Sequence, residues 1–234
     1  MTERRETGEP ERESEEMARQ PLTGERILHT GLRLIDQQGL EALTMRKLAS
    51  ELGVDPMSLY RHFKNKEALL DGVADILWGE IVLPGRETGW EALLRSVATS
   101  LYALAHAHPR AYTLLLNRQI LPLSMLQLSD AMRGRLQQEG FERQRAGEVI
   151  CALFSYAIGY AMVELATLLP PSATHAEAES MTDITRLAHL MQRLPRETPA
   201  HTVEAAYALT TYKADAQFTF GLDLMLMGLK CKAG

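Results

Sequence analysis

The stretch LTMRKLASELGVDPMSLYRHFKNKEALLD, residues 43–71, decides the fold of this 234-residue chain. Thr44 is a suitable N-cap for a first helix, and Gly53 is a suitable stop for it. Pro56 then begins a second helix that we expect to run to Phe63, because proline is tolerated at the first helical position. Two short helices separated by three residues predict a helix-turn-helix unit.

Small and apolar residues stand where the two helices must touch. Ala49 allows close approach, Gly53 supplies a turn with positive φ, and Val54 and Leu59 fill the interface. The opposite side of the second helix then stays exposed, short and polar at its tip. This is what a recognition helix in a DNA major groove requires.

The charge of the unit differs from the charge of the whole chain. The chain carries a formal net charge of −5, and residues 1–20 hold seven glutamates against four arginines. Residues 44–66 hold five cations against only Glu51 and Asp55, a net charge of +3. A local patch, and not the total, attracts phosphate, so the acidic total does not exclude a nucleic-acid binder.

Side-chain chemistry divides the candidate DNA contacts into base readers and phosphate donors. Arg46 suits a guanine edge, Ser58 suits a base edge, and Met57 suits a thymine methyl group. Arg61 suits either role. The candidate phosphate donors are Thr44, Tyr60, His62 and Lys66. Alone, each of these is more often a packing residue or part of a solvated face; their combination around a glycine turn favours DNA binding.

Helical patterns continue on both sides of this unit. The preceding helix has an apolar face and ends at Gly39, and its face consists of Ile27, Gly31, Leu34 and Ile35. Asn65 caps a following helix from Lys66 to about Leu83. Further helices are expected at 90–108, 110–117, 123–139, 142–169, 183–193 and 203–229. No alternating strand pattern occurs, so the prediction is an all-α fold.

Three segments bear on location and redox state. Residues 1–20 have almost no apolar content and predict a disordered tail, with no signal peptide. The apolar run 149–169 has the length of a membrane span, but Glu164 interrupts it, which favours a buried helix of a cytoplasmic protein with no membrane partner. Cys151 and Cys231 have neither disulfide-framework nor zinc-site spacing.

The segments LTMRKLASELGV and LYRHFKNKEALLD resemble the N-terminal domain of the TetR family of one-component repressors. The segments QQEGF and AQFTFGLDLMLMGL resemble the C-terminal domain of its tetracycline repressor branch. The resemblance implies a homodimer that a small-molecule effector releases from a double-stranded DNA operator. By position, it places the family's DNA contacts on Thr44, Arg46, Pro56, Met57, Ser58, Tyr60, His62 and Lys66. Pro56 and Met57 stand where relatives vary, so the operator sequence does not carry over.

The resemblance also divides the chain into a tail (1–20), a helix-turn-helix domain (21–66) and a helical effector-binding and dimerisation domain (67–234). It implies that the long apolar helix and the last helix pair with their mates in a four-helix bundle. The stripe on the last helix that permits this is Ala214, Phe218, Gly221, Leu222, Met225 and Leu229.

Effector-binding candidates are methionines, aromatic residues and a few polar groups, which suit an adaptable apolar cavity. They are Trp78, Tyr102, His106, Leu116, Asn117, Met125, Met132, Tyr156, Tyr160 and Glu164. The tetracycline branch places a metal-binding histidine where this chain reads RAYTLLLNRQI, which has none. We therefore expect no metal and no cofactor.

Two other function classes remain open at this point. An enzyme is disfavoured, because no nucleophile-elbow, zinc-protease, P-loop or dinucleotide motif is present. An activator, or a DNA-binding regulator without a small-molecule inducer, is compatible with the same sequence features.

Overall fold

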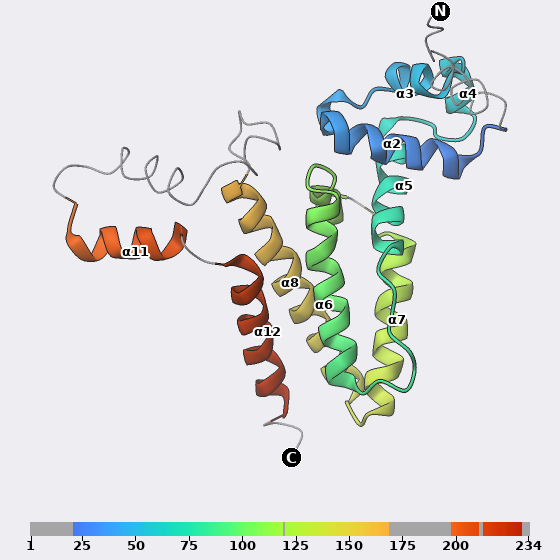
Figure 1. Cartoon of the computed structure of the whole chain (residues 1–234). Helices are drawn as coiled ribbons and strands as arrows, with labels where there is room; N and C mark the ends of the chain where they lie inside the picture. The colour runs from blue at the N-terminus through green and yellow to red at the C-terminus, as the bar shows by residue number, and fades with distance from the viewer. Residues whose placement is uncertain (1–20, 119, 169–197, 211–212, 231–234) are drawn as a thin grey trace, which may run out of the picture. The chain divides into compact units, whose positions relative to one another are not determined.

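The computed structural model describes residues 21–118, 120–168, 198–210 and 213–230 (Figure 1). Within these ranges every regular element is helical, which confirms the all-α prediction. The first elements are α2 (Gly24–Gln38), the 3₁₀ turn η1 (Leu40–Ala42), α3 (Met45–Leu52), α4 (Pro56–Tyr60) and α5 (Lys66–Gly79). The remaining elements are α6 (Trp90–Ala107), the 3₁₀ turn η2 (Tyr112–Leu115), α7 (Leu123–Gln138), α8 (Arg143–Leu168), α11 (Ala200–Thr210) and α12 (Ala214–Lys230). The expected tail at 1–20 and helix at 183–193 lie outside the described residues.

The chain divides into two compact units. The first consists of the described residues up to Leu83 together with His106–Gly134. The second consists of Pro84–Ala105 and the described residues from Arg135 onward. The helix-turn-helix therefore belongs to a unit that also contains α5, η2 and most of α7.

Helix α2 contributes five buried residues to the first unit. The Thr23 hydroxyl accepts a hydrogen bond from the backbone N–H of Arg26 at 3.2 Å and so caps its N-terminus. All four predicted apolar residues of its face are buried. Gly39 ends the helix with a φ of +87°, a conformation that favours glycine. The predicted stop of this helix at Gly39 is confirmed.

Helix α5 ends at Gly79, four residues before the predicted end at Leu83. The backbone N–H of Glu80 donates to Ile76 O, and that of Ile81 donates to Trp78 O, which closes the last turn. Pro84 disfavours a helical conformation only for Leu83, whereas the helix already ends at Gly79, a residue type of low helix propensity.

Two other predicted helices differ from the observed elements. The segment 110–117 forms only the short turn η2, because its closing bonds run from residue i+3 to residue i, as from Leu114 N to Ala111 O at 2.9 Å. The predicted helix 203–229 is two helices, α11 and α12. Residues 211–212, between these two helices, lie outside the described residues.

The second unit is built on α6, α8 and α12 (Figure 1). The Tyr102 ring of α6 stacks on Phe218 of α12, with ring centroids 4.3 Å apart. The Tyr156 hydroxyl of α8 donates to Phe218 O at 2.6 Å. Gly221 allows this approach, since a Cβ there would lie 2.3 Å from the Tyr156 hydroxyl oxygen.

Among the described helices, α8 alone is long and apolar enough to cross a membrane by length and composition. Within Arg143–Ala166 of this helix, 44% of the apolar 18-residue segment is buried inside the protein. A core helix of a soluble protein passes the same test, so α8 is weak evidence for a membrane span.

Candidate nucleic-acid interface

The turn between α3 and α4 has the predicted local chemistry. Thr44 caps α3, because its hydroxyl accepts from the backbone N–H of Lys47 at 3.1 Å. Gly53 adopts the left-handed conformation with a φ of +67°, and Val54 N donates to Ala49 O at 3.0 Å. Ala49 is fully buried, as expected for the point where the helices meet. The helix-turn-helix prediction is therefore correct at its turn.

Helix α4 exposes its N-terminal tip and buries a single side chain, that of Leu59. The Asp55 carboxylate accepts from the backbone N–H of Met57 at 2.8 Å and caps the helix, with Pro56 in its first turn. Met57 is 67% exposed, whereas Leu59 is fully buried. Leu59 is the only buried residue of α4. The helix thus presents its outer side while a single leucine anchors it.

The predicted end of this helix at Phe63 is wrong, because α4 ends at Tyr60. The carbonyl oxygen of Leu59 accepts from both His62 N and Phe63 N, at 3.0 and 2.9 Å. This double acceptance closes the helix in a tight turn. Arg61 and His62 therefore lie in the turn that follows α4.

The nine candidate DNA contacts lie on three elements and one turn of the first unit. Six side chains are exposed: Thr44, Arg46, Met57, Tyr60, Arg61 and His62. Three are half-buried: Pro56, Ser58 and Lys66. The Lys66 ammonium group donates to Leu40 O at 3.4 Å, so this cation is held near η1 at the first residue of α5. Their assignment as contacts stays a prediction.

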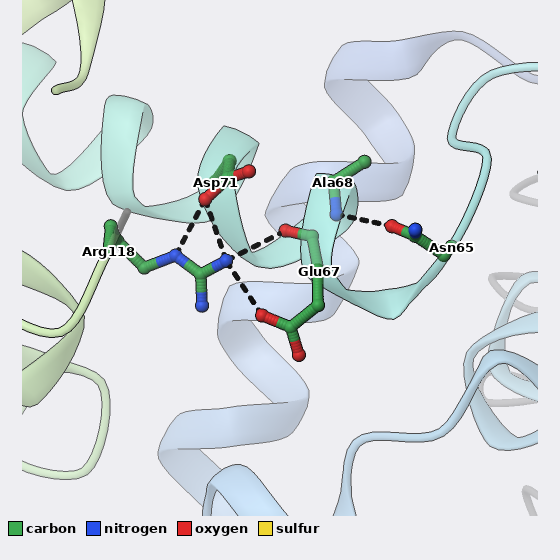
Figure 2. A network of polar contacts seen from close by, with 5 residues as sticks. All are labelled: Asn65, Glu67, Ala68, Asp71 and Arg118. Atoms are coloured by element: carbon green, nitrogen blue, oxygen red, sulfur yellow. Dashed lines mark hydrogen bonds and ion pairs between the residues drawn. The ribbon is translucent and has the colours of Figure 1, made fainter. Parts of the chain in front are cut away.

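A polar network that the sequence did not reveal holds the first turns of α5 (Figure 2). Arg118, after η2, donates from Nε to Asp71 at 2.7 Å. Its Nη2 donates to the carboxylate of Glu67 at 2.9 Å and to the carbonyl oxygen of Glu67 at 3.0 Å. Asn65 caps the same helix by accepting from Ala68 N at 2.8 Å. Glu67 and Asp71 stand four residues apart, which is the one sequence signal for a shared partner on this face.

A second polar cluster joins the C-terminal end of α2 to α5. His108 Nδ1 lies 2.7 Å from a carboxylate oxygen of Asp36, and its Nε2 lies 3.2 Å from Glu80. The bond to Asp36 is the largest influence that raises the pKa of His108, and Glu80 raises it further. Arg110 donates to the carbonyl oxygens of Asp36 and Gln37. The residues after α6 therefore hold both α2 and α5.

Four of the ten effector candidates come together in the second unit. The Tyr102 hydroxyl lies 2.7 Å from a carboxylate oxygen of Glu164 and 3.0 Å from one of Asp215. Tyr160 packs edge-on to Tyr102, and its hydroxyl donates to Ala214 O at 2.9 Å. Tyr156 completes the group through Phe218. Asp215 and Phe218 were missing from the predicted set.

The electrostatics of this group keep its hydroxyl groups protonated. Burial is the largest influence that raises the pKa of Tyr102, followed by the bond to Glu164. Burial also raises the pKa of Tyr160, with a further contribution from the Glu164 charge. The tyrosines therefore act as hydrogen-bond donors here.

The other six effector candidates belong to the first unit. Trp78 and Met132 are buried in its core, and Met125 is half-buried. His106, Leu116 and Asn117 are exposed. The structure does not gather all ten candidates in one compact unit.

A hollow of about 440 Å³ in the second unit contains none of the ten candidates. Its apolar lining comes from α6, α8 and α12, and Arg145 and Glu148 also border it. The described residues contain no group of three or more His, Cys, Asp or Glu side chains able to hold a metal ion.

The apolar stripe predicted on the last helix is only partly buried within its own protomer, because four of its six residues are half-buried. Phe218 and Leu222 are buried against the rest of the second unit. A different face of α12, comprising Phe220, Leu224 and Met227, is more than half exposed. Both faces of the helix are apolar, so periodicity alone did not show which one lies inward.

Two family models match the chain. The model described as bacterial regulatory proteins, tetR family, matches residues 27–73. The model described as tetracyclin repressor-like, C-terminal domain, matches residues 83–233. Together they span both compact units.

Curated relatives and solved structures agree with these matches. The chain is 28% identical over 217 residues to the HTH-type transcriptional repressor DrrR1 of Streptomyces coeruleorubidus, covering 89% of this chain and 77% of the relative. It is 30% identical over 215 residues to the class C tetracycline repressor protein of Escherichia coli, covering 89% and 91%. The crystal structure of the Streptomyces coelicolor TetR family protein ActR in complex with actinorhodin matches with a TM-score of 0.71 at 29% identity, covering 92% of this chain and 100% of that one.

Proposed function

Because the chain belongs to the TetR family of bacterial regulatory proteins, we propose that it is a transcriptional repressor that binds a palindromic operator as a homodimer and is released by a small-molecule effector. Regulators of this family are soluble DNA-binding proteins without enzymatic activity. Residues 21–66 form the DNA-binding domain, residues 67–234 form the effector-binding and dimerisation domain, and the protein acts in the cytoplasm.

The observation that carries the proposal is the shape of α4. It is capped by Asp55, anchored by Leu59 and exposed along its outer side, as a helix inserted in a major groove must be. Arg46 and Ser58 read base edges, and Met57 contacts a thymine methyl group. The phosphate contacts are Thr44, Tyr60, His62 and Lys66, and Arg61 and Pro56 complete the surface.

Dimerisation is supported by apolar surface that the protomer leaves exposed. Phe220, Leu224 and Met227 of α12 and Val163 of α8 are all more than half exposed. A two-fold dimer gives two recognition helices spaced for half-sites one helical turn apart, about 34–36 Å. This exposed face, together with the half-buried residues of the predicted stripe, is the surface that the bundle would use.

Effector release is supported by the relatives. The ActR structure contains actinorhodin, and other relatives are named tetracycline repressors. Tyr102, Tyr156, Tyr160 and Glu164 are the effector candidates that the structure brings together, and the remaining six stay in the proposed set. The effector acts by favouring a dimer whose recognition helices no longer match the half-site spacing.

The test is footprinting and gel-shift titration with the DNA that adjoins the gene. A protected palindrome, lost when effector is added, supports the proposal. Arg46→Ala should cost about 1–3 kcal/mol and relax one base position, whereas Lys66→Ala should weaken binding to every sequence alike. Equal losses on all sequences for Arg46→Ala would make it a phosphate contact. A protected site that no compound in a broad thermal-shift panel affects would favour a regulator without an inducer.

A further inference from the structure

We propose that Arg118 is a positioning residue for operator recognition, acting through the first two turns of α5 and not by touching DNA. This inference rests on the proposed function. Arg118 lies in the segment after η2, 52 residues beyond the proposed phosphate contact Lys66 along the chain. Its side chain is only 9% exposed, so its charge is largely enclosed by its partners.

Arg118 holds α5 at its N-terminal end. Its guanidinium group bonds to both the carbonyl oxygen and the carboxylate of Glu67, the second residue of the helix. It also bonds to Asp71, one turn further along, through Nε and Nη2 at 2.7 and 2.6 Å (Figure 2). A planar guanidinium group with several fixed donors determines direction as well as distance. Arg118 therefore fixes the end of α5 that begins at Lys66.

The acidic residues that Arg118 contacts belong to a longer row along α5. Glu67, Asp71 and Asp75 are spaced four residues apart and share one face of α5. Asp75 accepts from the backbone N–H of Ser124 at 2.8 Å, at the start of α7. Arg118 and Ser124 thus hold three successive turns of the helix. A shift of α5 along its axis would break every one of these bonds.

A short segment connects α5 to the proposed recognition helix α4. Only the five residues 61–65 separate α4 from α5, so the position of α4 follows the start of α5. Hydrogen bonds to base edges need heavy-atom distances of about 2.7–3.2 Å, and a displacement of about 1 Å removes them. Attraction to phosphate falls off slowly with distance and tolerates the same displacement. Loss of Arg118 should therefore reduce specific binding far more than non-specific binding.

The experiment measures the dissociation constant for the footprinted operator and for unrelated DNA, over a range of salt concentrations. The variants are Arg118→Met, Arg118→Lys, Asp71→Asn and the Arg118→Met/Asp71→Asn double variant. Arg133→Met is the matched control, because Arg133 is an exposed cation on α7 in the same compact unit. Thermal unfolding shows that each variant folds; α5 keeps its buried residues Leu69 and Leu70 in all of them.

Arg118→Met should lose operator affinity by about tenfold or more, with non-specific affinity changed less than about twofold. The slope of log K against log salt should stay unchanged, because no phosphate contact is removed. Arg118→Lys should recover part of the loss, since an ammonium group can bond to Asp71 without the forked contact to Glu67. The control Arg133→Met should retain operator affinity.

Asp71→Asn separates positioning from simple electrostatics. If Arg118 acted only by adding positive charge, removing an acid beside it would tighten DNA binding. If it acts by position, Asp71→Asn should weaken operator binding, and the double variant should be no worse than Arg118→Met alone. Tighter binding by Asp71→Asn, a salt slope reduced by about one for Arg118→Met, or equal behaviour of Arg118→Met and Arg133→Met would overturn the inference.

The wild-type protein distinguishes this result from failure of the proposed function. A wild-type protein without preference for any palindrome overturns the proposed function, and the positioning role with it. A wild-type protein that binds its operator, together with an Arg118→Met variant that binds equally well, overturns the positioning role alone.

Discussion

Replacement of Leu59 by alanine tests whether one side chain holds the recognition helix. Leu59 is fully buried and is the only buried residue in the five-residue helix α4. Leucine and alanine are both good helix formers, so the change leaves the local preference of the backbone nearly unaltered. The effect of the substitution therefore reports the loss of burial and the cavity that it leaves.

The expected loss of unfolding free energy is about 3 kcal/mol, within the range of about 2–5 kcal/mol for buried leucine-to-alanine changes. For a chain of this length the melting temperature should fall by about 6–12 °C. Met57→Ala is the control on the same helix, because Met57 is 67% exposed. Its unfolding free energy should change by less than about 0.5 kcal/mol, while its operator affinity falls.

The assay is urea unfolding followed by circular dichroism, combined with amide hydrogen exchange of residues 56–63. Leu59→Ala should accelerate exchange in this segment as well as lower the global midpoint. A loss below about 1 kcal/mol, or equal losses for Leu59→Ala and Met57→Ala, would refute the view that Leu59 alone anchors the helix.

Three further predictions concern other parts of the structure. Gly221→Ala should destabilise the second unit by about 1–3 kcal/mol in urea unfolding, because its Cβ would overlap the Tyr156 hydroxyl. The stabilisation from His108 and Asp36 should be complete below about pH 6.5 and decline as pH rises through the raised pKa of His108; His108→Gln should flatten the stability profile in that window. Asn65→Ala should lower the unfolding free energy by about 1 kcal/mol, because the helix cap is lost, whereas Asn65→Asp should retain most of the stabilisation from the cap. A His108→Gln profile parallel to the wild type, or equal stability of both Asn65 variants, would contradict these expectations.

Local chemistry made the helix-turn-helix predictable. Thr44, Gly53, Asp55 and Asn65 each act on backbone groups no more than four residues away. Their roles as caps and turn therefore follow from the order of residues alone. The end of α4 was not predictable in the same way, because it depends on which N–H groups share the Leu59 carbonyl.

The contacts that hold α5 were not predictable, since they join residues far apart in sequence. Arg118 meets Glu67 across 51 positions, and His108 meets Asp36 across 72. A row of acids at four-residue spacing indicates one face of a helix but does not identify the cation that binds it. Only the packing of the segment after α6 against α5 provides that information.

Residue type predicts only part of the arrangement of the candidate effector residues. Tyr102, Tyr160 and Glu164 do come together, because α6 and α8 pack with their aromatic sides facing. Asp215 was not among the candidates, because nothing in its sequence context distinguishes it. Only its place on α12, within hydrogen-bond distance of the Tyr102 hydroxyl, brings it into the group. Residue type predicts what a side chain can bind, while helix packing decides which side chains meet.

The separation of buried and exposed side chains on α4 has an evolutionary consequence. Leu59 alone anchors the helix, while Met57 and Tyr60 face outward and contribute little to the fold. If Met57 and Tyr60 contact DNA as proposed, mutations at these positions can change which DNA sequence is preferred without being removed by selection for stability. A duplicated gene with this architecture can therefore acquire a new set of target promoters through a few substitutions, while its sensory domain stays intact.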